Sequence, residues 1–456
     1  MSDSRKPNLI GRLPGGMGFD PGPAPVQEPP PPLPQYMPGQ LVVQLKDDAV
    51  GQVDTAGLLD SLQRRHGLAR MKPGDVGRSQ LSLQIRDTRQ MTDAIRNAEQ
   101  TPGVDFAEPV PYMWAPEFEV RSKPQIEAMV ASWKANPIIS PDGSSAIPVN
   151  PGDVGRWARD FVNRPIGWDG LKLENIAVLD SGCDPTHPAL AGRIDFADPI
   201  SGADRVGHGT FVCGSIAAKY TTVAAGLDDK VVSDTPDGLL PSSRLWVANV
   251  FTKAVKIGGV VRYHIDPPRY WGFLKAIADA KKSGKGRLSK IEVLSLSLGT
   301  AAASKTEKAH IAALIKAGVT VVAATGNQPS GFKTMPPMMY PAAYPGVIAV
   351  GALGFSKTRH AIRWQRSLWE LPEDSLRDSG VDVYAPGDLV LSAWPMAKGA
   401  NVQFSAYLSG TSMAAPFVAA VVAVLRSQGI SDRDKILTRL QQPNVFVEDA
   451  PALKWR

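Results

Sequence analysis

Short apolar runs alternate with helical stretches from about residue 157 onward. The runs expected to form strands cover residues 176–179, 245–250, 293–298, 319–323 and 347–350. Helical patterns follow Gly209, Tyr270, Thr306 and Thr411. Uninterrupted Val, Ile, Leu and Ala between helices is typical of strands that are covered on both faces. The pattern therefore predicts an α/β fold, a parallel sheet with helices on both faces, whose functional residues gather at the carboxyl ends of the strands.

The N-terminal part of the chain has a different pattern, which predicts a small α+β unit over residues 39–115. Strands are expected at residues 41–45, 81–85 and 104–113, and helices are expected to begin after Asp54 and Asp87. This order is typical of a ferredoxin-like fold. Pro109 and Pro111 cannot donate backbone hydrogen bonds, so they favour a sheet edge or a strand end for the last strand.

Proline and turn residues mark the other boundaries. Eleven of the 40 prolines fall in the first 40 residues, which predicts a disordered Pro-rich tail over residues 1–38. Docking of that polyproline segment on a partner is the open alternative. Residues 116–154 contain a Pro-Asp-Gly-Ser-Ser turn cluster and are predicted to form a linker. The large α/β domain is then expected over residues 155–456.

Composition narrows the class of protein. Hydrophobic residues make up 43% and charged residues 21% of the 456 residues, which is typical of a globular protein and excludes a wholly disordered or coiled-coil chain. The net charge of +6 is small for this length, and no nucleic-acid-binding motif or basic stripe is present. The longest apolar run, residues 414–425, is too short to span a bilayer. We therefore expect neither a nucleic-acid partner nor a membrane partner.

The termini and the cysteines bear on the compartment. The first residues lack the apolar run of a secretory signal, so a cytoplasmic location is expected, while leaderless export stays open. The two cysteines, Cys183 and Cys213, exclude a disulfide framework and a four-cysteine zinc site. We expect two buried free thiols, with a redox-sensitive pair as the alternative. No sequence motif assigns a metal site.

Four polar residues occupy positions where chemistry is common in such a sheet. Asp180 ends an apolar strand, and Asn327 follows another strand after a glycine. His208 lies between two glycines at the start of a helix of small residues, and Ser412 opens an apolar helix. A helix start favours developing negative charge. Each residue alone has an ordinary structural explanation, but together they place a carboxylate, a base, a hydroxyl and an amide donor at one edge of the sheet.

Extended strings around these residues resemble the subtilisin-like serine proteases, the subtilases of peptidase family S8. They are VLDSGCDPTHPAL around Asp180, GHGTFVCGSIAA around His208 and SGTSMAAPFVAAVVAVL around Ser412. The order Asp, His, Asn, Ser also agrees with this family. The resemblance covers roughly residues 155–440 and implies a serine endopeptidase.

The resemblance also implies a role for each residue. Asp180, His208 and Ser412 would form the catalytic triad, and Asn327 with the Ser412 backbone N–H would hold the oxyanion. No cofactor is required for this chemistry; many relatives bind structural Ca²⁺, so a calcium site stays open. A peptide-binding pseudoprotease that keeps the fold but does not cut is the alternative function.

Five further residues would contact a protein or peptide substrate if the resemblance holds. Ser297, Leu298 and Gly299 match the segment that pairs with the substrate backbone, and Gly326 precedes the oxyanion amide. The resemblance also implies that Met339 lies at the floor of the S1 pocket, where the family often has a small residue. A methionine there predicts a shallow pocket that prefers small or medium P1 residues.

Residues 39–114 resemble the inhibitor I9-type propeptide of the same family. In that family the domain assists folding and lays its C-terminal tail in the active-site cleft. The resemblance therefore implies a zymogen whose own N-terminal domain is an intramolecular inhibitor. The match puts Pro116 near the expected cleavage point, and proline is a poor P1 residue. Cleavage between about residues 117 and 155, or no cleavage, stays open, as does a dedicated protein or peptide substrate.

Overall fold

The computed structural model describes most of the chain. The described residues are 36–46, 57, 60, 64, 69–70, 80–85, 87–113, 119–121, 125–128, 151–222, 234–257, 260–327, 338–355, 362–365, 380–395, 404–441, 446–447 and 450–451. Residues 1–35 of the predicted Pro-rich tail, nearly all of the helix expected after Asp54 and most of the charged insertion at residues 361–379 lie outside these ranges. The last three residues of the predicted tail, 36–38, belong to a β-strand, because their backbone pairs in a sheet.

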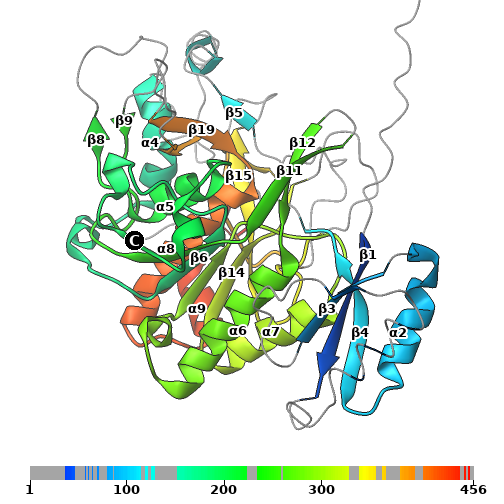
Figure 1. Ribbon diagram of the computed structural model, residues 1–456. Helices are drawn as coiled ribbons and strands as arrows, with labels where there is room; N and C mark the ends of the chain where they lie inside the picture. Colours follow the sequence, from blue (N-terminus) through cyan, green and yellow to red (C-terminus); the bar gives the residue numbers. More distant parts are fainter. Residues whose placement is uncertain are drawn as a thin grey trace, which may run out of the picture.

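A sheet of parallel strands forms the centre of the molecule (Figure 1). Its order is β16-β15-β14-β13-β6-β10-β7, and β17 also pairs with β15. All pairs are parallel except β15 with β16. The bounds are β6 Ile176–Asp180, β7 Ile194–Phe196, β10 Leu245–Asn249, β13 Val293–Leu296, β14 Thr320–Ala324, β15 Ile348–Phe355, β16 Ile362–Gln365 and β17 Val383–Pro386. This confirms the predicted parallel α/β sheet.

Helices cover both faces of the sheet. One face carries α4 (Pro151–Val162), α5 (His208–Ala217), α8 (Thr411–Ser427) and α9 (Arg433–Leu440), and the other carries α6 (Pro267–Ser283) and α7 (Lys305–Lys316). Strand β6 shows why both faces are apolar: Ile176 and Val178 belong to the first core, and Ala177 and Leu179 belong to the second. Side chains of a strand alternate between its faces, so a buried strand needs apolar residues at every position.

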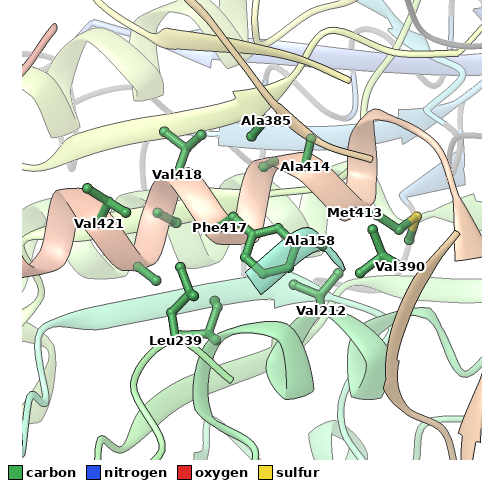
Figure 2. Close-up of a cluster of buried hydrophobic side chains, with 14 of the residues drawn as sticks. Ala158, Val212, Leu239, Ala385, Val390, Met413, Ala414, Phe417, Val418 and Val421 are labelled. Atoms are coloured by element: carbon green, nitrogen blue, oxygen red, sulfur yellow. The ribbon is translucent and has the colours of Figure 1, made fainter. Parts of the chain in front are cut away.

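The apolar helix α8 runs through the first core. Figure 2 shows Phe417 of this helix packed among side chains that include Ala158, Val212 and Leu239. Every residue from Thr411 to Leu425 is buried. Pro416 lies inside the helix, in its second turn, and the helix continues past it. Because burial surrounds the helix on all sides, it has no polar face until Arg426 and Ser427.

Smaller elements surround the large sheet. The additional strands are β5 Glu119–Arg121, β8 Thr221–Thr222, β9 Asp234–Thr235, β11 Phe251–Ile257, β12 Val260–Ile265, β18 Val390–Ala393, β19 Ser405–Ser409, β20 Phe446–Val447 and β21 Ala450–Pro451. Short 3₁₀ helices cover Thr88–Gln90, Ile166–Gly170, Pro188–Leu190, Pro199–Gly202 and Arg287–Lys290. Residues 125–128, within the segment predicted to be a linker, are helical.

The N-terminal domain is an antiparallel sheet with a helix against it. Its described strands are β1 (Tyr36–Leu45), β2 (Ala69–Arg70), β3 (Gln80–Gln84) and β4 (Val104–Pro111), in the order β2-β3-β1-β4, and helix α2 (Met91–Glu99) packs against them. Strand β4 lies at the sheet edge, as its prolines predict. The sheet and helix agree with the predicted small α+β unit.

This domain shares a core with the large domain. Leu41 and Val43 of β1 belong to the core that the sheet forms with α2, whereas Val42 between them packs in the core of α6 and α7. Val110 and Met113 are fully buried in that same core of the large domain. In Figure 1 the N-terminal domain accordingly sits beside α6 and α7. The two domains are therefore joined by apolar burial.

A carboxylate of the N-terminal domain also caps a helix of the large domain. Glu108 on β4 accepts hydrogen bonds from the Ser304 hydroxyl at 2.7 Å and from the backbone N–H groups of Lys305 and Thr306, each at 2.8 Å. These groups form the N-terminus of α7, which leaves its first N–H groups without helical partners. The negative charge also complements the positive end of the helix dipole.

A second buried carboxyl group lies close to this cap. Glu307, in the first turn of α7, is fully buried and accepts a hydrogen bond from the Tyr344 hydroxyl at 3.0 Å. Burial raises the pKa of Glu307 to about 7, and the negative charge of Glu108 adds to the increase. Docking of the N-terminal domain therefore favours the protonated form of Glu307.

We expect the stability of the full chain to fall as the pH rises through this pKa. The folded protein holds the Glu307 proton more tightly than an unfolded chain, whose pKa is near 4.5, so this stabilisation is complete below pH 4.5 and lost by pH 7. The shift corresponds to about 3 kcal/mol at most. Denaturant unfolding at pH 5 and pH 8 should show a smaller difference for Glu307→Gln than for the wild type. Equal differences in the two proteins would contradict this coupling.

Candidate active site

Asp180 and His208 meet in the interior of the large domain. Asp180 is the last residue of β6, and His208 is the first residue of α5. The Asp180 Oδ1 atom lies 2.8 Å from His208 Nδ1 and accepts a second hydrogen bond from the Ser181 backbone N–H at 2.7 Å. Both side chains are fully buried. An ionised carboxylate only accepts hydrogen bonds, so Nδ1 of a neutral imidazole carries the proton and Nε2 carries the lone pair.

Close backbone contact allows this approach. A Cβ atom on Gly209 would collide with the carbonyl oxygen of Gly182, which follows the Asp180 strand. Gly207, just before the helix, has a φ of 92°, in the left-handed region that favours glycine. Gly209 is therefore required by the contact between the His208 helix and the turn after Asp180, and Gly207 by its left-handed backbone conformation.

Asp204 ties the same two segments together. Its Oδ1 accepts hydrogen bonds from the Ser181 hydroxyl at 2.9 Å and from the Gly207 N–H at 2.8 Å, and its Oδ2 accepts from the Thr210 N–H at 2.8 Å and the Thr210 hydroxyl at 2.6 Å. The Ser181 hydroxyl in turn accepts from the Gly209 N–H at 2.8 Å. This network links the turn after Asp180 to the first turn of the His208 helix.

Ser412 is the second residue of α8, and strand β19 leads into it through Gly410 and Thr411. Two reciprocal hydrogen bonds join it to Ser297: the Ser412 hydroxyl donates to the Ser297 carbonyl at 3.3 Å, and the Ser297 hydroxyl donates to the Ser412 carbonyl at 2.9 Å. Ser412 and Ser297 are both buried. The neighbouring Leu298 is also fully buried. The structure thus brings the predicted nucleophile next to the segment predicted to pair with substrate.

Asn327 follows β14 and is fixed by the residue before Ser412. Its Oδ1 accepts hydrogen bonds from the Thr411 backbone N–H at 3.0 Å and from the Thr411 hydroxyl at 3.1 Å. The Thr411 hydroxyl also accepts from the Gly326 N–H at 3.2 Å. Because both hydrogen bonds from Thr411 to Asn327 use the amide oxygen, the NH₂ group of Asn327 is the end of the side chain that can donate to another group.

Met339 lies beside Gly326 and Gly299, two of the residues expected to contact substrate. A Cβ atom on Gly326 would collide with the Met339 sulfur, and a Cβ on Gly299 would lie 3.3 Å from Met339 Cβ. The methionine is 4% exposed, so its side chain fills this space. The structure therefore brings Gly299, Gly326 and Met339 together, as the sequence predicts.

The two cysteines lie near these groups. Both are buried and free of disulfides. Burial raises the pKa of the Cys213 thiol well above its usual value, and the neighbouring Cys183 thiol adds to that increase.

Within the described ranges, no cluster of three or more His, Cys, Asp and Glu side chains could hold a metal ion. None of the helices in the described part of the chain combines the length and apolar character needed for a membrane span.

Comparison with known proteins identifies the family. The model of the subtilase family, Peptidase_S8, matches residues 174–439, more than half of the chain. The chain belongs to the subtilase family of serine peptidases. It is 30% identical over 299 residues to the major intracellular serine protease of Bacillus subtilis, covering 63% of this chain and 79% of that protein.

Two more similarities place this subtilase among its relatives. It is 28% identical over 300 residues to the intracellular serine protease of Paenibacillus polymyxa, covering 63% of this chain and 77% of that one. Its fold is similar to the crystal structure of fervidolysin from Fervidobacterium pennivorans, a keratinolytic enzyme related to subtilisin, with a TM-score of 0.61 and 21% identity. That likeness covers 92% of this chain and 60% of the fervidolysin chain, and it concerns the fold alone.

Sequence reasoning did not single out several residues of the site. Asp204 lies four residues before His208 and had no distinctive pattern around it. Phe251 stacks on the His208 ring, with ring centroids 6.5 Å apart and an interplanar angle of 30°. Thr411 holds Asn327, although its sequence position had suggested only a helix start. An Asp three residues before a Gly-His-Gly string was the one signal that could have identified Asp204.

We expect Asp204→Asn to slow turnover while leaving substrate binding largely unchanged. An amide has one acceptor oxygen, so its NH₂ group would face backbone N–H donors at the start of α5 and shift His208. A loss of about 1.5–3 kcal/mol is typical for a hydrogen bond to a charged group, and about 1.4 kcal/mol corresponds to tenfold in kcat. Steady-state kinetics should show kcat at least about tenfold lower with a KM within about threefold. The exposed neighbour variant Arg205→Gln serves as the control, and a wild-type kcat in Asp204→Asn would contradict the assignment.

Proposed function

We propose that this subtilase is a serine endopeptidase in which Asp180, His208 and Ser412 form the catalytic triad. The observation that carries the proposal is the 2.8 Å contact between the buried Asp180 carboxylate and His208 Nδ1. It orients the imidazole with Nε2 as the base, and Ser412 lies at the start of α8, a helix packed against the His208 helix α5.

In this mechanism the Ser412 hydroxyl attacks the scissile carbonyl while His208 takes its proton and then gives it to the leaving amine. Asp180 stabilises the imidazolium that forms in between. The negative oxygen of the tetrahedral intermediate accepts hydrogen bonds from the Asn327 amide and the Ser412 backbone N–H. The two bonds from Thr411 to the Asn327 oxygen support this role, because they hold the amide in one orientation.

We further propose that the chain is made as a zymogen with residues 39–115 as its propeptide. Four observations support this. The N-terminal sheet shares a core with the large domain, and Glu108 caps α7. The tail after β4 reaches the site: the Met113 carbonyl accepts a hydrogen bond from the Ile265 N–H at 3.1 Å. In addition, His208 and Ser412 are both fully buried, so this form is closed to a substrate.

Two relatives of this chain are named intracellular serine proteases, which supports a function inside the cell. We propose that this protease acts there on a dedicated protein or peptide substrate. The Ser297–Gly299 segment would pair with the backbone of that substrate, a mode that gives affinity with little side-chain selectivity.

Ser412→Ala tests the proposed nucleophile. Removing this serine from subtilisin lowers kcat by about 10⁶, so we expect the variant to cleave neither added peptide nor its own chain. Intact-mass measurement of the two purified proteins should find only the wild type shortened, with a new N-terminus between about residues 115 and 155. If Ser412→Ala is shortened in the same way, the triad assignment is wrong. If both stay full length, labelling of Ser412 by a fluorophosphonate separates an active enzyme that keeps its N-terminal domain from a pseudoprotease.

Met339 provides a test of substrate preference. Because its side chain fills the space beside Gly326 and Gly299, we expect cleavage mainly after small or medium P1 residues. Met339→Gly should enlarge the pocket and raise the kcat/KM ratio of Phe over Ala at P1 by about tenfold or more, since each methylene accommodated contributes about 1–3 kcal/mol. A P1-varied peptide library measures both. Wild-type cleavage mainly after Phe or Tyr would refute the shallow pocket.

A further inference from the structure

A short strand from outside the large domain lies on the edge of the strand that leads to Ser412. Strand β5 pairs antiparallel with β19, with Tyr407 opposite Arg121, Leu408 opposite Val120 and Ser409 opposite Glu119. The other edge of β19 pairs with β18, so β5 completes a three-stranded sheet. Figure 1 shows β5 beside β19, far from the other strands of the N-terminal part of the chain. Ser409 is only three residues before Ser412.

The chain is anchored on the opposite side of the site just before this strand. The Met113 carbonyl accepts a hydrogen bond from the Ile265 N–H, Ile265 pairs with Phe251, and Phe251 stacks on His208. Met113 thus lies on the His208 side and Glu119 on the Ser412 side. The described residues on either side of the proposed triad, Met113 and then Glu119, thus follow one another in the same order as the residues of a bound peptide substrate would.

Strand β5 has its own anchor in the large domain. Ile126, five residues beyond it, is 1% exposed and belongs to the same core as Trp157 of α4 and Phe417 of α8. The N-terminal domain packs instead against the α6 and α7 core. The contacts that hold β5 are thus separate from those that hold the N-terminal domain, and a cut before Glu119 would leave the β5 contacts intact.

We propose that β5 is a second intramolecular inhibitor, which occupies the edge of β19 where the leaving-group side of a peptide substrate binds. This inference rests on the proposed endopeptidase function. An extended peptide gains affinity from backbone hydrogen bonds with an open strand edge, so any substrate that continues past the scissile bond competes with β5 for β19. Because β5 is part of the same chain, its effective concentration at that edge is high. The inhibition persists after the N-terminal domain leaves and acts only on substrates with residues beyond the scissile bond.

The double variant Val120→Pro/Arg121→Pro tests this inference. Successive N–H groups of a strand point to opposite sides, so two consecutive prolines remove whichever of the two faces β19. The matched control is Val120→Ala/Arg121→Ala, which keeps both N–H groups. Each protein is assayed once intact-mass measurement shows that its self-processing is complete, on two substrates with the same residues before the scissile bond. One continues for five residues beyond that bond, and the other ends there in a p-nitroanilide.

We expect the proline variant to lower the KM for the extended peptide at least fivefold relative to the alanine control. Its kcat/KM for the p-nitroanilide should stay within twofold of the control, because that substrate does not reach β19. Ile126→Ala, which weakens the anchor, should lower the KM for the extended peptide in the same direction. If the proline variant unfolds at a lower temperature than the control, the Ile126→Ala result decides.

Other outcomes overturn the inference. Equal KM values for the extended peptide in the proline and alanine variants would mean that β5 does not compete with substrate. An equal gain for both substrates would place the inhibition on the other side of the scissile bond. If neither substrate is cleaved by the wild type or by any variant, the proposed endopeptidase function fails, and the role of β5 fails with it.

Discussion

The buried carboxylate of Asp180 is the constraint on which the arrangement of the site depends. A charge in the interior is costly unless hydrogen bonds compensate it. Here the hydrogen bonds come from the Ser181 N–H and from His208. Because His208 belongs to another segment of the chain, that segment must lie against the end of the central strand β6. The helix that carries His208 must therefore approach the backbone after β6 closely, and Gly209 makes that approach possible, because a Cβ atom there would collide with the Gly182 carbonyl oxygen.

The same physical solution recurs where the two domains meet. Glu108 is also a nearly buried carboxylate, and its charge is compensated by groups at the start of α7. In both places a carboxylate on or after a strand is matched to donors on a separate segment. At the site the match fixes an imidazole, and at the interface it fixes one domain on another. The interface differs in holding a second carboxyl group, Glu307, close to the first.

Much of the fold followed from the sequence because buried parallel strands have an unmistakable pattern. The strands containing Val178, Val247 and Val322 lie where their apolar runs predicted, since both faces of such strands must be apolar. Asp180, His208, Asn327 and Ser412 likewise stand at the strand ends and helix starts where the sequence placed them.

Other features had no local signature. The hydrogen bonds of Asp204 depend on how the turn after β6 meets the loop before α5, and nothing in either segment alone reports that meeting. Strand β5 is three residues long and is defined only by its partner β19, which is almost 290 residues away in the chain. The domain boundaries predicted at residues 38, 115 and 154 remain predictions. The sequence locates such boundaries only approximately, because short segments like β5 gain their structure from tertiary contacts rather than from propensity.

The shared core between the domains has a consequence for the large domain on its own. Val42, Val110 and Met113 are fully buried against the face of α6 and α7, so removal of the N-terminal domain would expose the apolar side chains beneath them to water. Exposed apolar patches make proteins associate with one another or with chaperones. After separation, the large domain would thus carry an exposed apolar face. Self-association through that face would limit the concentration of the domain in solution unless another surface covers it.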